Sequence, residues 1–172
     1  MTTLVLVFHP HLTDGGSKVN ARMLAELEAS GHDDVVVRDE YALYPDFHVD
    51  AATEQQALEA ADHVMFQFPL YWYSSPALLK QWEDEVIAAG WAYGGGRALK
   101  GKTLQLVVTT GSAAAKYQKD GEYGRTMDEL LSPFEMVAYK VEMTYRQPYL
   151  VQGTSTIDDA ALDAAAKAYP AA

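Results

Sequence analysis

Cysteine is absent from the 172 residues of this chain. Its absence excludes disulfides, thiolate nucleophiles, cysteine-ligated zinc and iron–sulfur clusters together. Any redox chemistry must therefore come from a bound organic cofactor, and we expect no metal.

Basic residues are also scarce. The chain has 13 Lys and Arg against 24 Asp and Glu, a formal net charge of −11, and its basic residues are scattered. Because a phosphate backbone is bound by clustered positive charge, we expect no nucleic-acid partner. A small phosphorylated ligand would need local help from backbone N–H groups.

Long apolar runs are missing as well, since no stretch approaches the roughly 20 apolar residues of a membrane span. The start, Met1–Val5, leads into strand-like sequence without a basic leader, which favours a cytoplasmic protein. Apolar residues make up 49% of the chain, enough for one domain over residues 1–172.

What the chain does have is a regular alternation of apolar runs and helical patterns. Strands are predicted at 3–8, 35–38, 64–68, 104–108 and 147–152, and helices at 19–29, 53–61, 77–89, 127–139 (interrupted near Pro133) and 158–168. This order predicts an α/β fold: a five-stranded parallel sheet, strand order 2-1-3-4-5, with helices on both faces. Ligands of such sheets bind where the winding reverses, here after strands one, three and four.

The segment after the first strand suits a phosphate, because it is rich in turn formers and opens a helix with free N–H groups. Ser17 can donate a hydroxyl, Lys18 adds a positive charge, and Asn20 can fix the loop or the ligand. Alternatively, Ser17 only caps the helix and His9 only satisfies nearby backbone groups. Neither G-x-x-x-x-G-K-[ST] nor G-x-G-x-x-G is present, which favours a mononucleotide.

Three consecutive aromatic residues, at 71–73, follow the third strand, and they cannot all face one core. They suit stacking on a planar ligand, although a packed corner or a subunit interface would also explain them. After the fourth strand, residues 109–113 are small enough to let the backbone approach a ring, or they form an ordinary glycine turn.

With these residues the chain resembles the NAD(P)H:quinone oxidoreductases of the DT-diaphorase group, especially the short bacterial members that include ancillary oxidoreductases of potassium efflux. The resemblance runs almost end to end. The motifs that carry it are His9-Pro10 with Ser17-x-x-Asn20, Leu43–Phe47, Phe68–Tyr73, Pro76–Trp82, Gly90–Gly94 and Thr109–Gly111.

The resemblance implies a flavodoxin-like three-layer sandwich that holds FMN, with FAD less favoured because FAD-binding relatives are longer. The phosphate, the ring and its pyrimidine edge would be bound by residues of the three loops. The residues implied are His9, Ser17, Lys18, Val19, Asn20, Pro69, Leu70, Tyr71, Trp72, Tyr73, Thr110, Gly111, Ser112, Ala113 and Tyr117.

The resemblance also implies catalytic roles for Tyr117 and Tyr123, the latter where the family pattern has a histidine. A hydroxyl donor there would stabilise negative charge on the reduced ring, although a tyrosine is a poorer proton source than a histidine near neutral pH. The family is dimeric, so we expect a homodimer with the site at the interface and with Tyr73 and Tyr93 lining a shared substrate pocket.

The expected activity is hydride transfer from NADH or NADPH, by a ping-pong mechanism, to quinones or to azo and nitro compounds. Two alternatives stay open. One is an ancillary subunit that regulates a potassium-efflux transporter. The other is an electron-carrier flavodoxin, although the first loop lacks the T-x-T-x-x-T-G phosphate pattern of that family.

Overall fold

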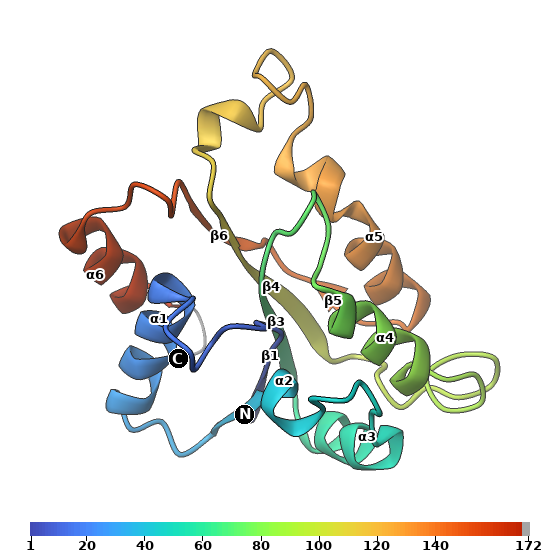
Figure 1. Cartoon of the computed structure of the whole chain (residues 1–172). Coiled ribbons are helices and arrows are strands. Elements are labelled where there is room, and N and C mark those ends of the chain that lie inside the picture. The colour runs from blue at the N-terminus through green and yellow to red at the C-terminus, as the bar shows by residue number, and fades with distance from the viewer. Residues whose placement is uncertain (170–172) are drawn as a thin grey trace.

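A parallel sheet with helices on both faces is the frame of the computed structural model, which describes residues 1–169 (Figure 1). Along the sheet the order is β2-β1-β3-β4, and two short strands, β5 and β6, both pair with β4, all in parallel. The strands are β1 (Thr3–Val7), β2 (Val35–Asp39), β3 (His63–Pro69), β4 (Thr103–Thr110), β5 (Thr144–Tyr145) and β6 (Tyr149–Gln152). The predicted α/β class and strand order are confirmed.

The fifth position of the sheet differs from the prediction of one strand over 147–152. The β5 strand pairs with Thr103 and Leu104, whereas β6 pairs with the far half of β4, residues 107–110. Pro148 stands between them, and a proline has no N–H to donate to a sheet. The strand therefore begins one residue after the proline, at Tyr149.

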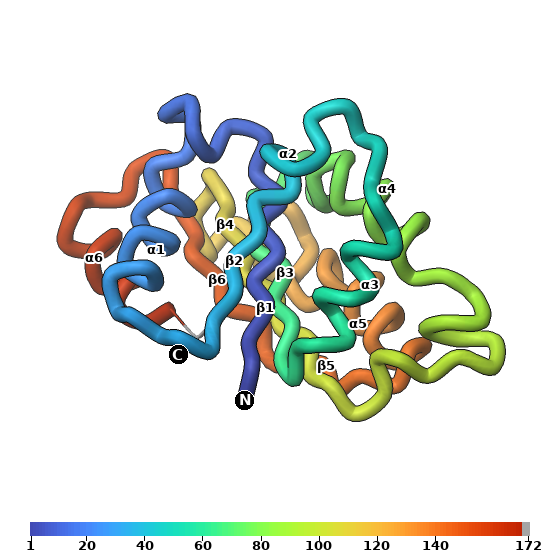
Figure 2. The backbone as a smooth tube through the Cα atoms, turned by 90° about the horizontal axis from the view of Figure 1, so that it is seen from below, coloured from blue at the N-terminus to red at the C-terminus, as the bar shows by residue number. Residues whose placement is uncertain are grey.

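The helices form two layers with the strands between them, as Figure 2 shows from below the view of Figure 1. Helices α1 and α6 lie together on one face, and α3, α4 and α5 cover the other. Their bounds are α1 (Lys18–Ala29), α2 (Glu40–Leu43), α3 (Ala51–Ala60), α4 (Ala77–Val86), α5 (Met127–Lys140) and α6 (Asp159–Lys167), with a 3-10 turn, η1, at Ala114–Lys116. The short α2 was not predicted, and α4 ends three residues before the predicted Ala89.

Alternation along the strands divides the core into two. Leu4 and Leu6 of β1 pack with Trp82 of α4, whereas Val5 and Val7 pack with Met23 of α1. This period of two is what a strand buried on both faces requires. Because the strands are parallel, the carboxyl ends of β1, β3, β4 and β6 meet at one edge of the sheet.

The predicted interruption of the fourth helix at Pro133 is wrong, because α5 runs unbroken from Met127 to Lys140. Pro133 has no N–H for the carbonyl of Glu129, four residues earlier. The Ser132 hydroxyl donates to that same carbonyl at 2.9 Å instead. Within residues 1–169, no helix is long and apolar enough to cross a membrane.

Candidate functional site

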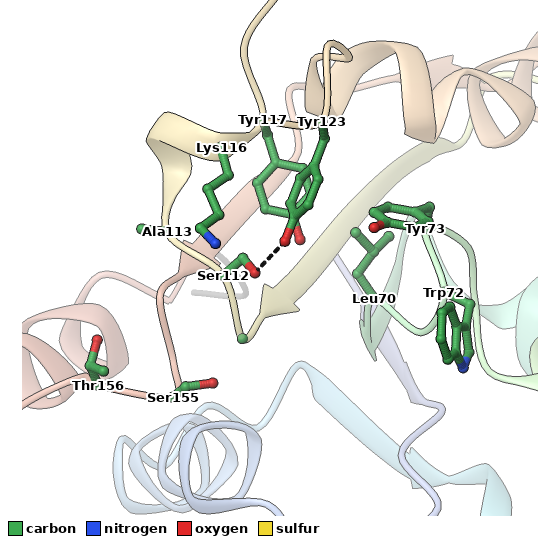
Figure 3. A pocket seen from close by; sticks show the side chains of 11 residues that line it. Leu70, Trp72, Tyr73, Ser112, Ala113, Lys116, Tyr117, Tyr123, Ser155 and Thr156 are labelled. Atoms are coloured by element: carbon green, nitrogen blue, oxygen red, sulfur yellow. Dashed lines mark hydrogen bonds between the residues drawn. The ribbon is translucent and has the colours of Figure 1, made fainter. Parts of the chain in front are cut away.

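Two adjoining hollows open at the carboxyl edge of the sheet. The first, here called the polar hollow, has a volume of about 330 Å³ and is lined by His9, Gly16, Ser17, Lys18, Val19, Asn20, Pro69, Leu70, Tyr71, Thr109, Gly111 and Thr154. The second, the aromatic hollow, has a volume of about 560 Å³ and is lined by Leu70, Trp72, Tyr73, Gly111, Ser112, Ala113, Lys116, Tyr117, Tyr123, Ser155 and Thr156 (Figure 3). Because both are lined by Leu70 and Gly111, they form one elongated site with a polar and an aromatic end.

The polar hollow lies at the N-terminus of α1, where free N–H groups attract an anion. Ser17 precedes the helix but makes no side-chain capping bond. Its hydroxyl is buried and has no hydrogen-bond partner within the described chain. A buried hydroxyl without a partner is costly, so the interpretation of Ser17 as a simple cap does not account for it.

His9 faces the same hollow as a neutral ring. The N–H of His11 donates to Nδ1 of His9 at 3.0 Å, so the proton of the neutral ring lies on Nε2. Burial lowers the pKa of His9, and the nearby His11 lowers it further. His9 can therefore donate one hydrogen bond to a ligand without carrying a charge.

Two predicted phosphate contacts have other partners in the structure. The Lys18 ammonium pairs with Asp159 of α6 at 2.7 Å, on the exposed side of the helix. The amide of Asn20 donates to Thr109 Oγ1 and accepts from Gln67 Nε2, each at 3.1 Å. Of the two roles considered for Asn20, the structure supports fixing the loop.

A tight turn supplies one wall of the aromatic hollow. Tyr71 and Ser74 exchange two backbone hydrogen bonds, and the residues between them, Trp72 and Tyr73, have φ of 49° and 64°. Both central residues of this turn are thus left-handed, as in a type I′ turn, where glycine or asparagine is usual. The turn leaves Trp72 92% exposed and Tyr73 47% exposed.

Three tyrosines cluster at the aromatic end. The ring centroids of Tyr117 and Tyr123 are 5.0 Å apart, and Tyr73 lies 5.4 Å from Tyr123 on the other side (Figure 3). The hydroxyls of Tyr123 and Ser112 are hydrogen-bonded at 2.8 Å. Burial raises the pKa of Tyr117, so this phenol keeps its proton and is able to donate it.

The aromatic hollow has one charged lining residue in the described chain, Lys116. Its ammonium pairs with Glu122 at 2.7 Å and lies 5.8 Å from the ring centre of Tyr123. Thr110, by contrast, lines neither hollow. Its hydroxyl donates to the carbonyl of Ser112 at 2.7 Å and so helps to fix the loop after β4.

The segment 154–156, after β6, was missed by the sequence analysis. Thr154 lines the polar hollow, and Ser155 and Thr156 line the aromatic one. Backbone hydrogen bonds from Gly153 to Ser112 and from Thr154 to Thr110 attach the segment to the loop after β4. The signal that the sequence carries for this segment is its position directly after the carboxyl end of the last strand.

Tyr93 lines neither hollow within one chain. It borders a separate depression of about 340 Å³ that is also lined by residues of α4 and α5, here called the Tyr93 hollow. The Lys140 ammonium lies 5.5 Å from the centre of its ring. A shared substrate pocket containing Tyr93 would therefore require a second chain.

Comparison with known proteins gives a consistent fold. Residues 1–172 match a family described as having a flavodoxin-like fold. General stress protein 14 of Bacillus subtilis is 49% identical over 90% of this chain and 87% of its own. The uncharacterized NAD(P)H oxidoreductase YrkL of the same organism is 45% identical over the same shares. The potassium-efflux ancillary protein KefF of an Enterobacter species is 38% identical over 96% of this chain and 93% of its own.

Solved structures agree. A general stress protein 14 of Treponema denticola, in complex with FMN, is 37% identical over 97% of this chain and 92% of its own, with a TM-score of 0.87. An NADPH-quinone reductase of P. pentosaceus is 33% identical over 98% of this chain and 95% of its own, with a TM-score of 0.88. A protein described as a thermophilic tryptophan halogenase is 39% identical over 95% of this chain and 94% of its own, with a TM-score of 0.91. The activity names differ, whereas the fold is common to all.

Proposed function

Since this chain belongs to the flavodoxin-like family, we propose that it is an FMN-dependent NAD(P)H oxidoreductase that reduces quinones or similar acceptors. One observation carries the proposal. The buried Ser17 hydroxyl, without a protein partner, lies at the N-terminus of a 12-residue helix, in a hollow that continues into an aromatic one. A mononucleotide with a planar ring likewise has a polar phosphate end and an aromatic end.

The residues present fit FMN. Ser17 Oγ, Nε2 of His9 and the first N–H groups of α1 are donors for a phosphate. Trp72 and Tyr73 offer aromatic surface to the ring. Gly111, which lines both hollows, has no Cβ to obstruct a ligand that passes from one to the other.

When bound, FMN would supply the two-electron chemistry, taking hydride from a nicotinamide and giving it to an acceptor. The chain's part is to hold donors where negative charge grows on the ring. Tyr117 is suited to this, because its raised pKa keeps the phenol protonated at neutral pH. Tyr123, tied to Ser112, is the second donor.

The proposal includes a ping-pong order, which the open form of the aromatic hollow supports. Its about 560 Å³ open to solvent past Tyr73 and Trp72, both at least 47% exposed. With FMN bound there, we expect nicotinamide and acceptor to use the same opening one after the other. The acceptors we propose are accordingly planar molecules: quinones, with azo and nitro aromatics as alternatives.

The names of relatives support the proposal: one is called an NAD(P)H oxidoreductase, one structure an NADPH-quinone reductase, and another contains FMN. The name KefF favours a second candidate, an ancillary subunit of a potassium-efflux transporter. The two functions are compatible. Co-purification with such a transporter would support the second.

The test is spectroscopic. The purified chain should show a flavin spectrum, and NADH or NADPH should bleach it anaerobically, with menadione restoring the colour. Ser17→Ala should retain less flavin, whereas Ser30→Ala, at the other end of α1, where the hydroxyl donates to Leu27, should retain as much as wild type. A colourless protein that does not bind added FMN would refute the proposal. Flavin that nicotinamides cannot reduce would instead indicate an electron carrier.

A further inference from the structure

A row of buried polar side chains runs behind the polar hollow. Tyr169 OH lies 2.5 Å from Gln67 Oε1, Gln67 Nε2 lies 3.1 Å from Asn20 Oδ1, and Asn20 Nδ2 lies 3.1 Å from Thr109 Oγ1. All four side chains are at most 8% exposed. The row joins the chain just after α6 to β3, to the first turn of α1 and to the end of β4.

The direction of this row is fixed by one backbone atom. Gln67 Nε2 also lies 3.4 Å from the main-chain carbonyl oxygen of Asn20, which can only accept. The NH₂ group of Gln67 therefore faces Asn20, and its oxygen faces Tyr169. Burial raises the pKa of Tyr169, so the phenol holds the proton that it donates.

The orientation of Gln67 also fixes that of the Asn20 amide, and with it the role of the Thr109 hydroxyl. Asn20 uses its oxygen to accept from Gln67, so its NH₂ group faces Thr109 and donates. Thr109 Oγ1 is then an acceptor toward Asn20, and its own proton must point elsewhere. Thr109 lines the polar hollow together with Ser17, whose hydroxyl has no partner.

We propose that Thr109 donates its hydroxyl proton to the phosphate of the mononucleotide, and that Tyr169, Gln67 and Asn20 act as positioning residues that set this direction. The inference rests on the proposed function and adds to it a donor from β4. It also explains why a carboxamide, and not an acid, stands at Asn20: a carboxylate could accept from Gln67 but could not donate to Thr109.

The experiment compares two flavins that differ only in the phosphate. The full-length apoprotein is titrated with FMN and with riboflavin, and Kd is read from the quenching of flavin fluorescence. Thr109→Val keeps the shape of the side chain and removes the hydroxyl. It should raise the Kd for FMN by about tenfold to a hundredfold, as for loss of a charge-assisted bond, and change the Kd for riboflavin less than about twofold.

Tyr169→Phe removes the first donor and frees the Gln67 amide to turn, so it should lower the preference for FMN in the same direction but by less. Thr109→Ser, which keeps the hydroxyl, should restore the preference. The matched control is Thr144→Val, on β5 at the opposite end of the sheet, which should change neither Kd. Thermal unfolding of each apoprotein checks that the variants fold.

An equal loss of affinity for both flavins in Thr109→Val would show that the hydroxyl supports the loop or the sugar chain, and would overturn the inference. So would unchanged Kd values. In both cases FMN binding by wild type leaves the proposed function standing. A wild-type chain that binds neither flavin would overturn both.

Discussion

At residue scale, the most consequential departure from the family pattern is Tyr123, which stands where a histidine is expected. Its hydroxyl is hydrogen-bonded to Ser112, and its ring packs against Tyr117. A tyrosine offers a hydrogen bond but gives up its proton far less readily than a histidine at neutral pH. We therefore assign stabilisation of the reduced ring mainly to Tyr117, whose phenol is the more buried.

Tyr117→Phe should slow anaerobic flavin reduction by NAD(P)H about a hundredfold, the usual cost of losing one preorganised donor. FMN content should not change, because the proposed bond strengthens only as charge develops. Adding Tyr123→Phe should slow reduction further. Stopped-flow rates at saturating nicotinamide provide the measurement, and a double variant as fast as wild type would make both tyrosines structural.

Candidate ligand-binding residues are easier to recognise in a sequence than residues that act through others. Ser17 and the aromatics at 71–73 stand out because each directly precedes a helix or follows a strand, a position that is visible in the sequence, although capping and packing are alternatives there. The sequence indicates only that residues 109–113 are small, because the role proposed for the Thr109 hydroxyl depends on Gln67 and Tyr169, which are 42 and 60 residues away. Such a contact has no local signal in one sequence.

At the scale of elements, the turn between β3 and α4 combines exposure with backbone strain. Neither Trp72 nor Tyr73 is a glycine, yet both have positive φ. Left-handed backbone in a residue with a side chain costs of order 1 kcal/mol, and such strain gathers at functional sites. The turn therefore presents its aromatic side chains at a cost in stability.

Trp72→Gly should accordingly raise the free energy of unfolding of the apoprotein by about 1 kcal/mol, since a 92% exposed side chain contributes little packing. The same change should weaken FMN binding by removing the indole. Trp72→Ala separates the two effects, because it removes the indole but keeps the strain. Urea unfolding and FMN titration of both variants give the comparison, and equal stability of the two would argue against strain.

The helices and strands themselves were largely predictable, since β1, β3 and β4 are rich in apolar residues and α1 has a clear apolar face. Two of the errors lie at prolines, which have no backbone N–H to donate. Ser132 lets α5 continue through Pro133, and no periodicity reports that bond. Pro148 divides the fifth strand, and there the proline itself was the neglected signal.

For the whole molecule, a buried acid connects stability to pH. Glu40 is fully buried, and burial, followed by the nearby Glu54, raises its pKa from 4.5 to about 8, although Arg38 opposes the shift. Between these two values the folded chain holds a proton that the unfolded chain has lost. Stability should therefore fall as pH rises from about 5 to about 8.

Glu40→Gln should flatten this fall by up to about 1.4 kcal/mol per pH unit, the contribution of one proton. The glutamine keeps the shape of the side chain but cannot ionise, so the slope rather than the absolute stability is the readout. Urea unfolding at pH 5, 6, 7 and 8 measures it. Identical slopes for variant and wild type would mean that Glu40 is already ionised in the folded chain at neutral pH.

The second whole-molecule expectation is a homodimer with a composite site. Met136 is 61% exposed and Tyr139 is 78% exposed, and Met136 borders the Tyr93 hollow. Exposed apolar side chains beside a depression suit a partner surface. Sedimentation velocity should show a dimer that Met136→Glu with Tyr139→Glu dissociates, while Val36→Glu, on the β2 edge, does not. A fully active monomer would contradict a role for Tyr93.

The division of the last sheet position by Pro148 also bears on how the chain behaves when crowded. An exposed sheet edge is a template on which another chain can add a strand and begin a fibril. Here that edge offers only two residues of β5 and four of β6, separated by three residues of which the last, Pro148, has no N–H. An incoming strand would find no continuous ladder to extend. Replacing Pro148 with a β-former such as valine would supply an N–H donor at that position and should make concentrated solutions of the protein more prone to aggregate.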